Sequence, residues 1–144
     1  MSENHDWWTA PAITDDGERD ILVSGRRDIT RFRNNKRFCI RIEISWTYNQ
    51  DPDAGMPDDE TARIMGDATD NMIATFDTDP VAVLTGIFTG AGERTWVFYT
   101  LSTNIFQKKI NEALAPLPLL PLHITAENDP AWEAYDEMSQ VEVR

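Results

Sequence analysis

The fold is decided by residues 38–48, which read FCIRIEISWTY. Large apolar side chains occupy every second position from Phe38 to Tyr48, while Arg41 and Glu43 stand between them. Side chains along a β-strand point alternately to opposite faces of the sheet, so this period of two predicts a strand. We expect its apolar face to pack on the core.

The segments after this strand complete the order strand, helix, strand, strand, helix, strand. The first helix carries apolar residues at helical spacing and ends before Pro80, which cannot continue it. The next two strands form a hairpin around a turn at residues 90–93, where glycine supplies the positive φ that such turns need. The predicted segments after the first strand are residues 57–79, 81–89, 94–102, 103–117 and 122–126.

This order is the split βαβ pattern of ferredoxin-like sandwiches. It predicts an α+β fold over residues 38–126, in which a βαββαβ antiparallel sheet carries two helices on one face. A short additional strand is expected at residues 21–23, where three β-branched or aliphatic residues precede a glycine.

We expect a single domain over residues 1–144, because this length suits one hydrophobic core. Residues 1–18 show no clear period and are expected to form an N-terminal arm. Trp7 and Trp8 within that arm are expected to pack on the domain, since each indole can bury a large apolar area. Residues 130–140 predict a C-terminal helix with proline at its tolerated first position.

Composition predicts a soluble globular protein, with 41% hydrophobic and 26% charged residues. The longest apolar stretch, residues 114–122, is interrupted by prolines and is too short to span a bilayer. The first residues lack the basic and apolar regions of a secretory signal. A single cysteine excludes an intramolecular disulfide framework, so we expect a cytoplasmic protein.

Charge is unevenly distributed along the chain. The formal net charge of −12 repels phosphate backbones and anionic lipid, yet residues 26–41 hold seven of the 13 basic residues. One interpretation pairs these cations with acids of the same chain, and the other makes them a basic patch that docks an acidic partner. Residues 94–98 lack the glycines of an RNA-recognition signature, so we expect no nucleic-acid partner. The negative net charge and the lack of a bilayer-spanning stretch lead us to expect no membrane partner.

No motif predicts a catalytic residue, a metal ion or a cofactor. Residues 51–55 depart from the calcium-loop template, because the glycine comes one position early and Ala62 replaces the final glutamate. The turn at residues 90–93 joins two strands, whereas a phosphate loop joins a strand to a helix. Cys39 and His123 belong to predicted neighbouring strands and could form a pair, although chance placement is the favoured interpretation.

The sheet face away from the two helices is the candidate binding surface. Alternation along the predicted strands is expected to direct Arg41, Glu43, Trp96, Phe98 and His123 to this face. Such a face is normally covered or functional. It is either hidden by the N-terminal residues or a second copy of the chain, or it forms a ligand or partner site. The side chains expected to face the helices are Ile40, Ile42, Ile44, Leu84, Phe88, Val97, Tyr99 and Leu122.

Four short stretches carry a resemblance to a known family. They read WWTAP at residues 7–11, GIFTGAGERTW at 86–96, NEALAP at 111–116 and AENDPAW at 126–132. Together they resemble the bacterial domain-of-unknown-function family numbered 695, over nearly the whole chain. The resemblance implies no catalytic residues. Some relatives are joined to a domain similar to the regulator of ribonuclease E activity B family, whose fold is also ferredoxin-like.

The sequence therefore favours a non-catalytic cytoplasmic module that binds a protein partner or associates with itself. The alternative is a small-molecule-binding protein or an enzyme that uses the open sheet face. The two hypotheses differ in whether that face holds a pocket.

Overall fold

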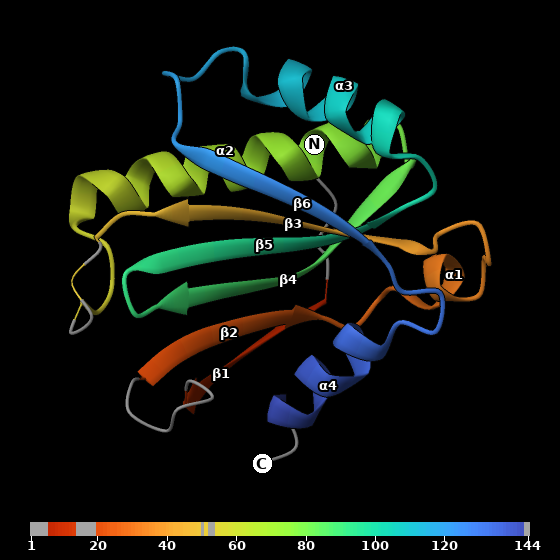
Figure 1. The fold of residues 1–144 in the computed structure, drawn as a ribbon, viewed down its shortest axis with the longest axis horizontal. Helices are drawn as coiled ribbons and strands as arrows, with labels where there is room; N and C mark the ends of the chain where they lie inside the picture. Colours follow the sequence, from red (N-terminus) through yellow and green to blue (C-terminus); the bar gives the residue numbers. More distant parts are fainter. Residues whose placement is uncertain (1–5, 14–19, 50, 52–53, 143–144) are drawn as a thin grey trace.

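The residues that the structure describes form one six-stranded antiparallel sheet with four helices, an α+β arrangement. The computed structural model describes residues 6–13, 20–49, 51 and 54–142. Neighbouring strands in the sheet follow the order β1-β2-β4-β5-β3-β6 (Figure 1). The strands are β1 (Trp7–Ile13), β2 (Asp20–Arg26), β3 (Ile40–Thr47), β4 (Ala82–Gly90), β5 (Glu93–Thr100) and β6 (Leu122–Asn128).

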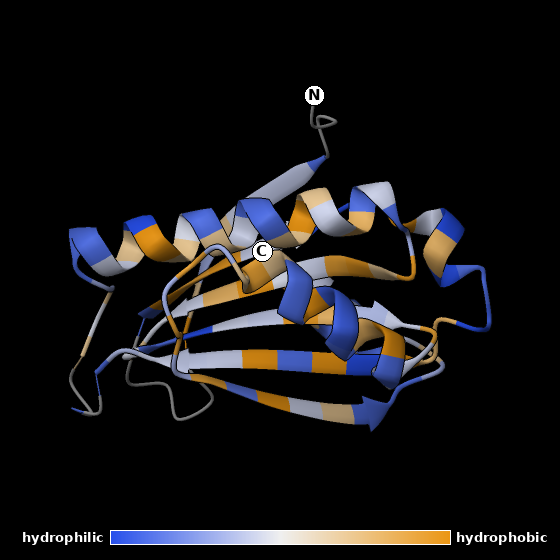
Figure 2. Ribbon diagram, turned by 90° about the horizontal axis from the view of Figure 1, so that it is seen from above, coloured by the Kyte–Doolittle hydropathy of each residue, from blue (hydrophilic) through white to orange (hydrophobic). Residues whose placement is uncertain are grey.

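Two long helices cover one face of the sheet. Helix α2 (Asp59–Thr78) begins where the Asp58 carboxylate accepts a hydrogen bond from the amide of Thr61, and α3 (Thr103–Leu114) is capped in the same way by Ser102. Hydrophilic and hydrophobic residues alternate along α2, as expected of a helix with one buried side (Figure 2). Both long helices and their apolar faces are confirmed, although α3 ends at Leu114, three residues before its predicted end.

The main core lies between these helices and the sheet. Its largest side chains include Trp96 and Phe98 from β5, both fully buried. The indole Nε1 of Trp96 donates a hydrogen bond to the hydroxyl of Thr69 in α2, at 2.8 Å. The prediction that Trp96 and Phe98 line the open face is therefore wrong.

Strand pairing explains this error. Residues directly opposite each other on paired strands share a face, and Ile42 stands opposite Phe98 while Ile44 stands opposite Trp96. Val97 consequently points to the other face, as does Tyr99. Because residues 96–99 are all large and apolar or aromatic, their own sequence carries no alternation that would assign the faces.

A β-bulge explains why the predicted faces of Ile87 and Phe88 on β4 are wrong. Leu84 pairs with Phe98 and Gly86 pairs with Val97, so one extra residue stands between the two pairs on β4. The bulge reverses the alternation along β4. Ile87 therefore packs in the main core, whereas Phe88 packs against the opposite face, the reverse of the prediction.

The other face of the sheet is partly covered by α4 (Glu133–Glu142), whereas the short helix α1 (Thr30–Arg33) lies beside the ends of the strands (Figure 1). Phe32 of α1 packs with Val83 and Tyr99. Trp132 stacks on Tyr99 with ring centroids 4.0 Å apart, and its indole N–H donates to the carbonyl of Phe38. Met138 of α4 packs with Val23 and Trp8. The molecule thus has apolar clusters on both sides of the sheet.

The N-terminal residues extend the sheet and do not form an irregular arm. Trp7–Ile13 are strand β1, which pairs along its length with β2. Trp8 is buried, so the expectation that the tryptophans pack on the domain is confirmed. Residues 1–5 and 14–18 of the predicted arm lie outside the described residues. Among the helices of the described part, none has the length and apolar character that a membrane crossing requires.

Candidate functional site

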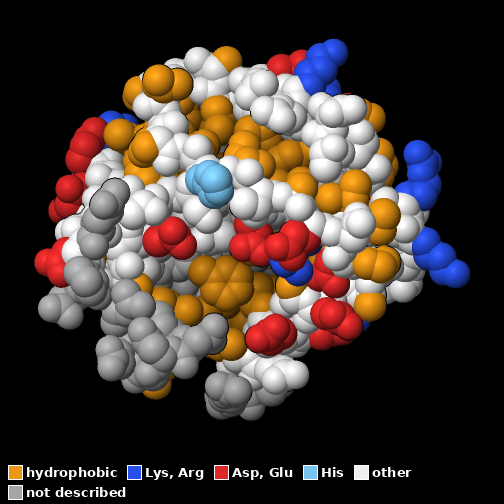
Figure 3. All heavy atoms as spheres, in the orientation of Figure 1, with side chains coloured by type: hydrophobic (Ala, Val, Ile, Leu, Met, Phe, Trp, Pro, Cys, Tyr) orange, Lys and Arg blue, Asp and Glu red, His pale blue; other side chains and the backbone are white. Residues whose placement is uncertain are grey.

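A cleft of about 600 Å3 lies between α4 and the sheet face opposite α2 and α3. Its floor comes from β4 and β5, through Thr85, Phe88, Thr95 and Val97. Helix α4 supplies one wall, and β2 contributes Val23. Figure 3 shows apolar surface on this side of the molecule, bordered by acidic side chains.

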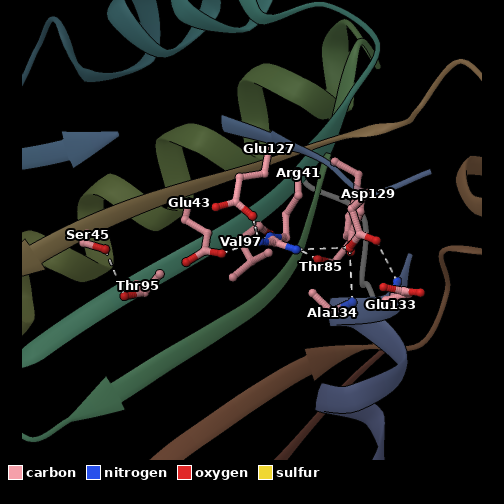
Figure 4. A network of polar contacts seen from close by, with 11 residues as sticks. Arg41, Glu43, Ser45, Thr85, Thr95, Val97, Glu127, Asp129, Glu133 and Ala134 are labelled. Atoms are coloured by element: carbon pink, nitrogen blue, oxygen red, sulfur yellow. Dashed lines mark hydrogen bonds and ion pairs between the residues drawn. The ribbon is translucent and has the colours of Figure 1, made fainter. Parts of the chain in front are cut away.

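Arg41 lies at one end of this cleft and is held by three carboxylates. Its guanidinium contacts Glu43 at 2.9 Å, Glu127 at 2.7 Å and Asp129 at 3.3 Å. These residues come from β3 and from the end of β6, which are neighbouring strands (Figure 4). Burial alone would lower the pKa of Arg41, but the attraction of Glu43, Asp129 and Glu127 outweighs it and raises the pKa.

Asp129 is the buried centre of this network. Its carboxylate accepts hydrogen bonds from the Tyr99 hydroxyl at 2.6 Å and from the amides of Glu133 and Ala134 at 2.9 and 3.1 Å. Burial would raise the pKa of Asp129, but these hydrogen bonds and Arg41 lower it overall, so the group is an anion at neutral pH. Burial and the bond to Asp129 raise the pKa of Tyr99, which keeps its hydroxyl protonated.

The same contacts fix where α4 begins. Asp129 caps the helix through its side chain, and the first helical residue is Glu133. Trp132, just before it, has φ of +57°, a backbone conformation outside the α-helix. The predicted helix therefore starts three residues later than residue 130, and α4 is anchored to β3 and β5 through one carboxylate.

The electrostatic balance of this end of the cleft is negative. Arg41 contributes one positive charge against the three carboxylates it contacts, which leaves a net charge of −2 for the four residues. Glu137 of α4 also lines the cleft. The arrangement therefore attracts a cationic group and repels a free anion.

Three of the five residues predicted for the open face lie on that face, and two of them line the cleft. Arg41 and Glu43 line the cleft. His123 lies on the same face, since it stands opposite Ser45 on β3, but it does not line the cleft. Trp96 and Phe98 lie on the other side of the sheet.

Several cleft residues escaped the sequence prediction. Val97 and Phe88 were assigned to the helix-covered face, and Thr85 and Thr95 carried no signal. Glu137 was missed because nothing in the local sequence places α4 across the sheet. The polar pair Arg41 and Glu43 within an apolar strand was the signal that did identify this end of the site.

The basic residues between 26 and 41 are largely engaged within the chain. Arg26 contacts Asp28, Arg27 contacts Asp6, and Arg33 contacts Asp136 at 2.7 Å. Together with the network of Arg41, these pairs favour the interpretation of intramolecular ion pairs over a basic docking patch.

The conceivable pairing of Cys39 with His123 is ruled out. Asp129 pairs with Cys39, whereas His123 pairs with Ser45, six residues further along β3. At about 3.3 Å per residue, this separates the two side chains by about 20 Å. Within the described residues, no group of three or more His, Cys, Asp or Glu side chains is arranged to hold a metal ion.

Comparison with known proteins agrees with the motif resemblance. No curated protein and no solved structure matches the chain. The model of a family of unknown function, DUF695, matches residues 5–138, a span that includes most of the residues lining the cleft, the Arg41 network and the cap of α4. The chain therefore belongs to the DUF695 family.

Proposed function

We propose that the protein is a non-catalytic binding protein whose cleft holds a small amphipathic ligand with an apolar body and a cationic group. The observation that carries the proposal is the cleft of about 600 Å3 with an acidic end, on the sheet face predicted as the binding surface. Pockets of this size are typical of small-molecule sites.

The lining of the cleft offers a partner to each part of such a ligand. Val23, Phe88, Val97 and Met138 provide an apolar surface that can remove a hydrocarbon or aromatic body from water. Glu43 and Glu137 line the same cleft and can pair with an ammonium or guanidinium group. The positive charge of Arg41 is already balanced by its three carboxylates, which disfavours an anionic ligand.

We further infer a ferredoxin-like arrangement for β3, α2, β4, β5, α3 and β6. It is supported by the strand order β4-β5-β3-β6 and by the packing of α2 and α3 in one core. The inferred kinship with the regulator of ribonuclease E activity B family rests on this arrangement alone and transfers no activity, because one fold serves many functions.

The test uses two probes of similar shape and opposite charge, phenethylamine and 3-phenylpropanoate. Binding is followed by titration in NMR spectra of the labelled protein. We expect the amine to shift resonances of residues around Val97 and Thr85 and to bind at least tenfold more tightly than the carboxylate. Equal binding of both probes, or shifts elsewhere on the molecule, would contradict the proposal.

Variants separate the charge of the cleft from its shape. Glu43→Gln should weaken amine binding several-fold, while Glu112→Gln on α3, on the other side of the sheet, should leave it unchanged. Thr95→Trp should fill the cleft and abolish binding of both probes. If neither probe binds the wild-type chain and thermal unfolding is unchanged across a panel of amines, the cleft is not a small-molecule site.

A further inference from the structure

Strand β6 forms an edge of the sheet and is unusually exposed. It pairs with β3 on one side only, and every residue from His123 to Asn128 is exposed. Ile124, on the helix side, is 40% exposed, and Leu119 in the connector that leads into β6 is fully exposed. An open strand edge with neighbouring apolar side chains is a template for pairing with another strand.

The hydrogen-bond pattern shows which backbone groups point outward. The amide of Asp129 donates to the carbonyl of Cys39 at 2.8 Å, so these residues form a hydrogen-bonded pair. Such pairs alternate along an antiparallel ladder. The backbone groups of His123, Thr125 and Glu127 therefore face β3, whereas those of the even-numbered residues, Leu122, Ile124, Ala126 and Asn128, face away from the sheet.

The sequence of β6 is complementary to itself in one antiparallel register. With a two-fold axis at Thr125, the outward backbone groups of Ile124 meet those of Ala126 in the second copy, as the ladder requires. The same register places His123 opposite Glu127. An imidazole donor then faces a carboxylate acceptor at two symmetry-related positions, and all seven residues of the strand are paired.

The opposite edge of the sheet differs. Strand β1 contains Pro11, which lacks a backbone donor, and α4 packs against β1. Strand β6 contains no proline, lysine or arginine that would oppose pairing.

We propose that the protein forms a symmetric dimer through antiparallel pairing of β6 with β6 of a second copy, centred on Thr125. The two sheets join into one continuous sheet, and His123 of each copy lies opposite Glu127 of the other. The cleft stays open, because β6 does not line it.

The test is sedimentation velocity of the full chain from low micromolar to submillimolar concentration. We expect a reversible monomer–dimer equilibrium. His123→Glu places two carboxylates opposite each other and should weaken the dimer about tenfold, because the change acts at both symmetry-related pairs. His123→Lys should tighten it. Thr9→Glu, which adds the same charge on β1, is the matched control and should have no effect.

A second variant tests the backbone pairing itself. Ala126→Pro removes an outward N–H that the ladder with β3 does not use, so circular dichroism should stay unchanged while the dimer is lost. A monomer at every concentration would overturn the proposal. So would a dimer that keeps its affinity in both His123→Glu and Ala126→Pro.

Discussion

Replacing Asp129 by alanine should destabilise the protein far more than any other acidic substitution in the Arg41 network. The Asp129 side chain is 5% exposed and joins three elements, since it binds Tyr99 of β5, Arg41 of β3 and the first amides of α4. The loss therefore removes a helix cap and leaves a hydroxyl without its acceptor.

The magnitude follows from these contacts. Loss of an N-cap costs about 1 kcal/mol. Leaving the buried Tyr99 hydroxyl without an acceptor for its proton costs about 1–3 kcal/mol. Arg41 keeps its contacts with Glu43 and Glu127, so the loss of its ion pair with Asp129 adds little to the destabilisation. We expect Asp129→Ala to lower the free energy of unfolding by about 2–4 kcal/mol.

The assay is urea unfolding at pH 7, followed by tryptophan fluorescence. Glu127→Ala is the control, because Glu127 contacts the same arginine at 2.7 Å but is 68% exposed. It should cost less than about 1 kcal/mol. Equal losses of unfolding free energy in the two variants would refute the reasoning. They would mean that the burial of Asp129 does not increase its contribution to stability beyond that of charge pairing alone.

The pH dependence supplies a second check with a definite sign. The folded state lowers the pKa of Asp129, so its carboxylate stabilises the protein above the ordinary aspartate pKa of about 4, and this contribution is lost as the pH falls through the folded pKa. The stability difference between wild type and Asp129→Asn should be full at pH 7 and shrink below about pH 4. A difference that stays constant from pH 7 to pH 2 would contradict the lowered pKa.

Four further outcomes are expected. A Cβ on Gly86 would lie 2.4 Å from the sulfur of Met138, so Gly86→Ala should shift α4 and lower the melting temperature. Gly66→Ala in α2 meets no atom within 4 Å and should stabilise by about 0.5–1 kcal/mol; a fall in melting temperature there would be unexpected. Trp96→Ala should lower the free energy of unfolding in urea by about 3–5 kcal/mol. A loss below about 1 kcal/mol would mean that the indole does not belong to the core. Single-stranded RNA should give no polarisation signal at physiological salt, because cations such as Arg33 are paired within the chain; a signal lost in Arg31→Ala would reverse this prediction.

Local pattern was sufficient for the helices and for the order of the core elements. Apolar residues at helical spacing and a stopping proline predicted α2, which ends at Thr78. Paired positive-φ glycines, Gly90 and Gly92, predicted the hairpin turn. These features depend on backbone sterics and on a period that a short stretch contains by itself.

The side of the sheet to which each side chain of β4 and β5 points depends on pairing with other strands, which the sequence of one strand does not contain. Trp96, Val97, Phe98 and Tyr99 are all suited to burial, and both sides of the sheet are covered at their positions. Only the pairing register of β5 with β3 decides that Trp96 and Phe98, and not Val97 and Tyr99, point toward α2. The extra residue on β4 reverses the alternation in a way that its sequence does not signal.

The candidate site shows the same division. The sequence alone determined that Arg41 and Glu43 share the polar face of one strand, because alternation along that strand is unambiguous. The cleft on this face exists because α4 lies across the sheet. Asp129 anchors α4 there through partners on β3 and β5. Those partners are distant in sequence, so only the folded chain brings them within hydrogen-bonding distance.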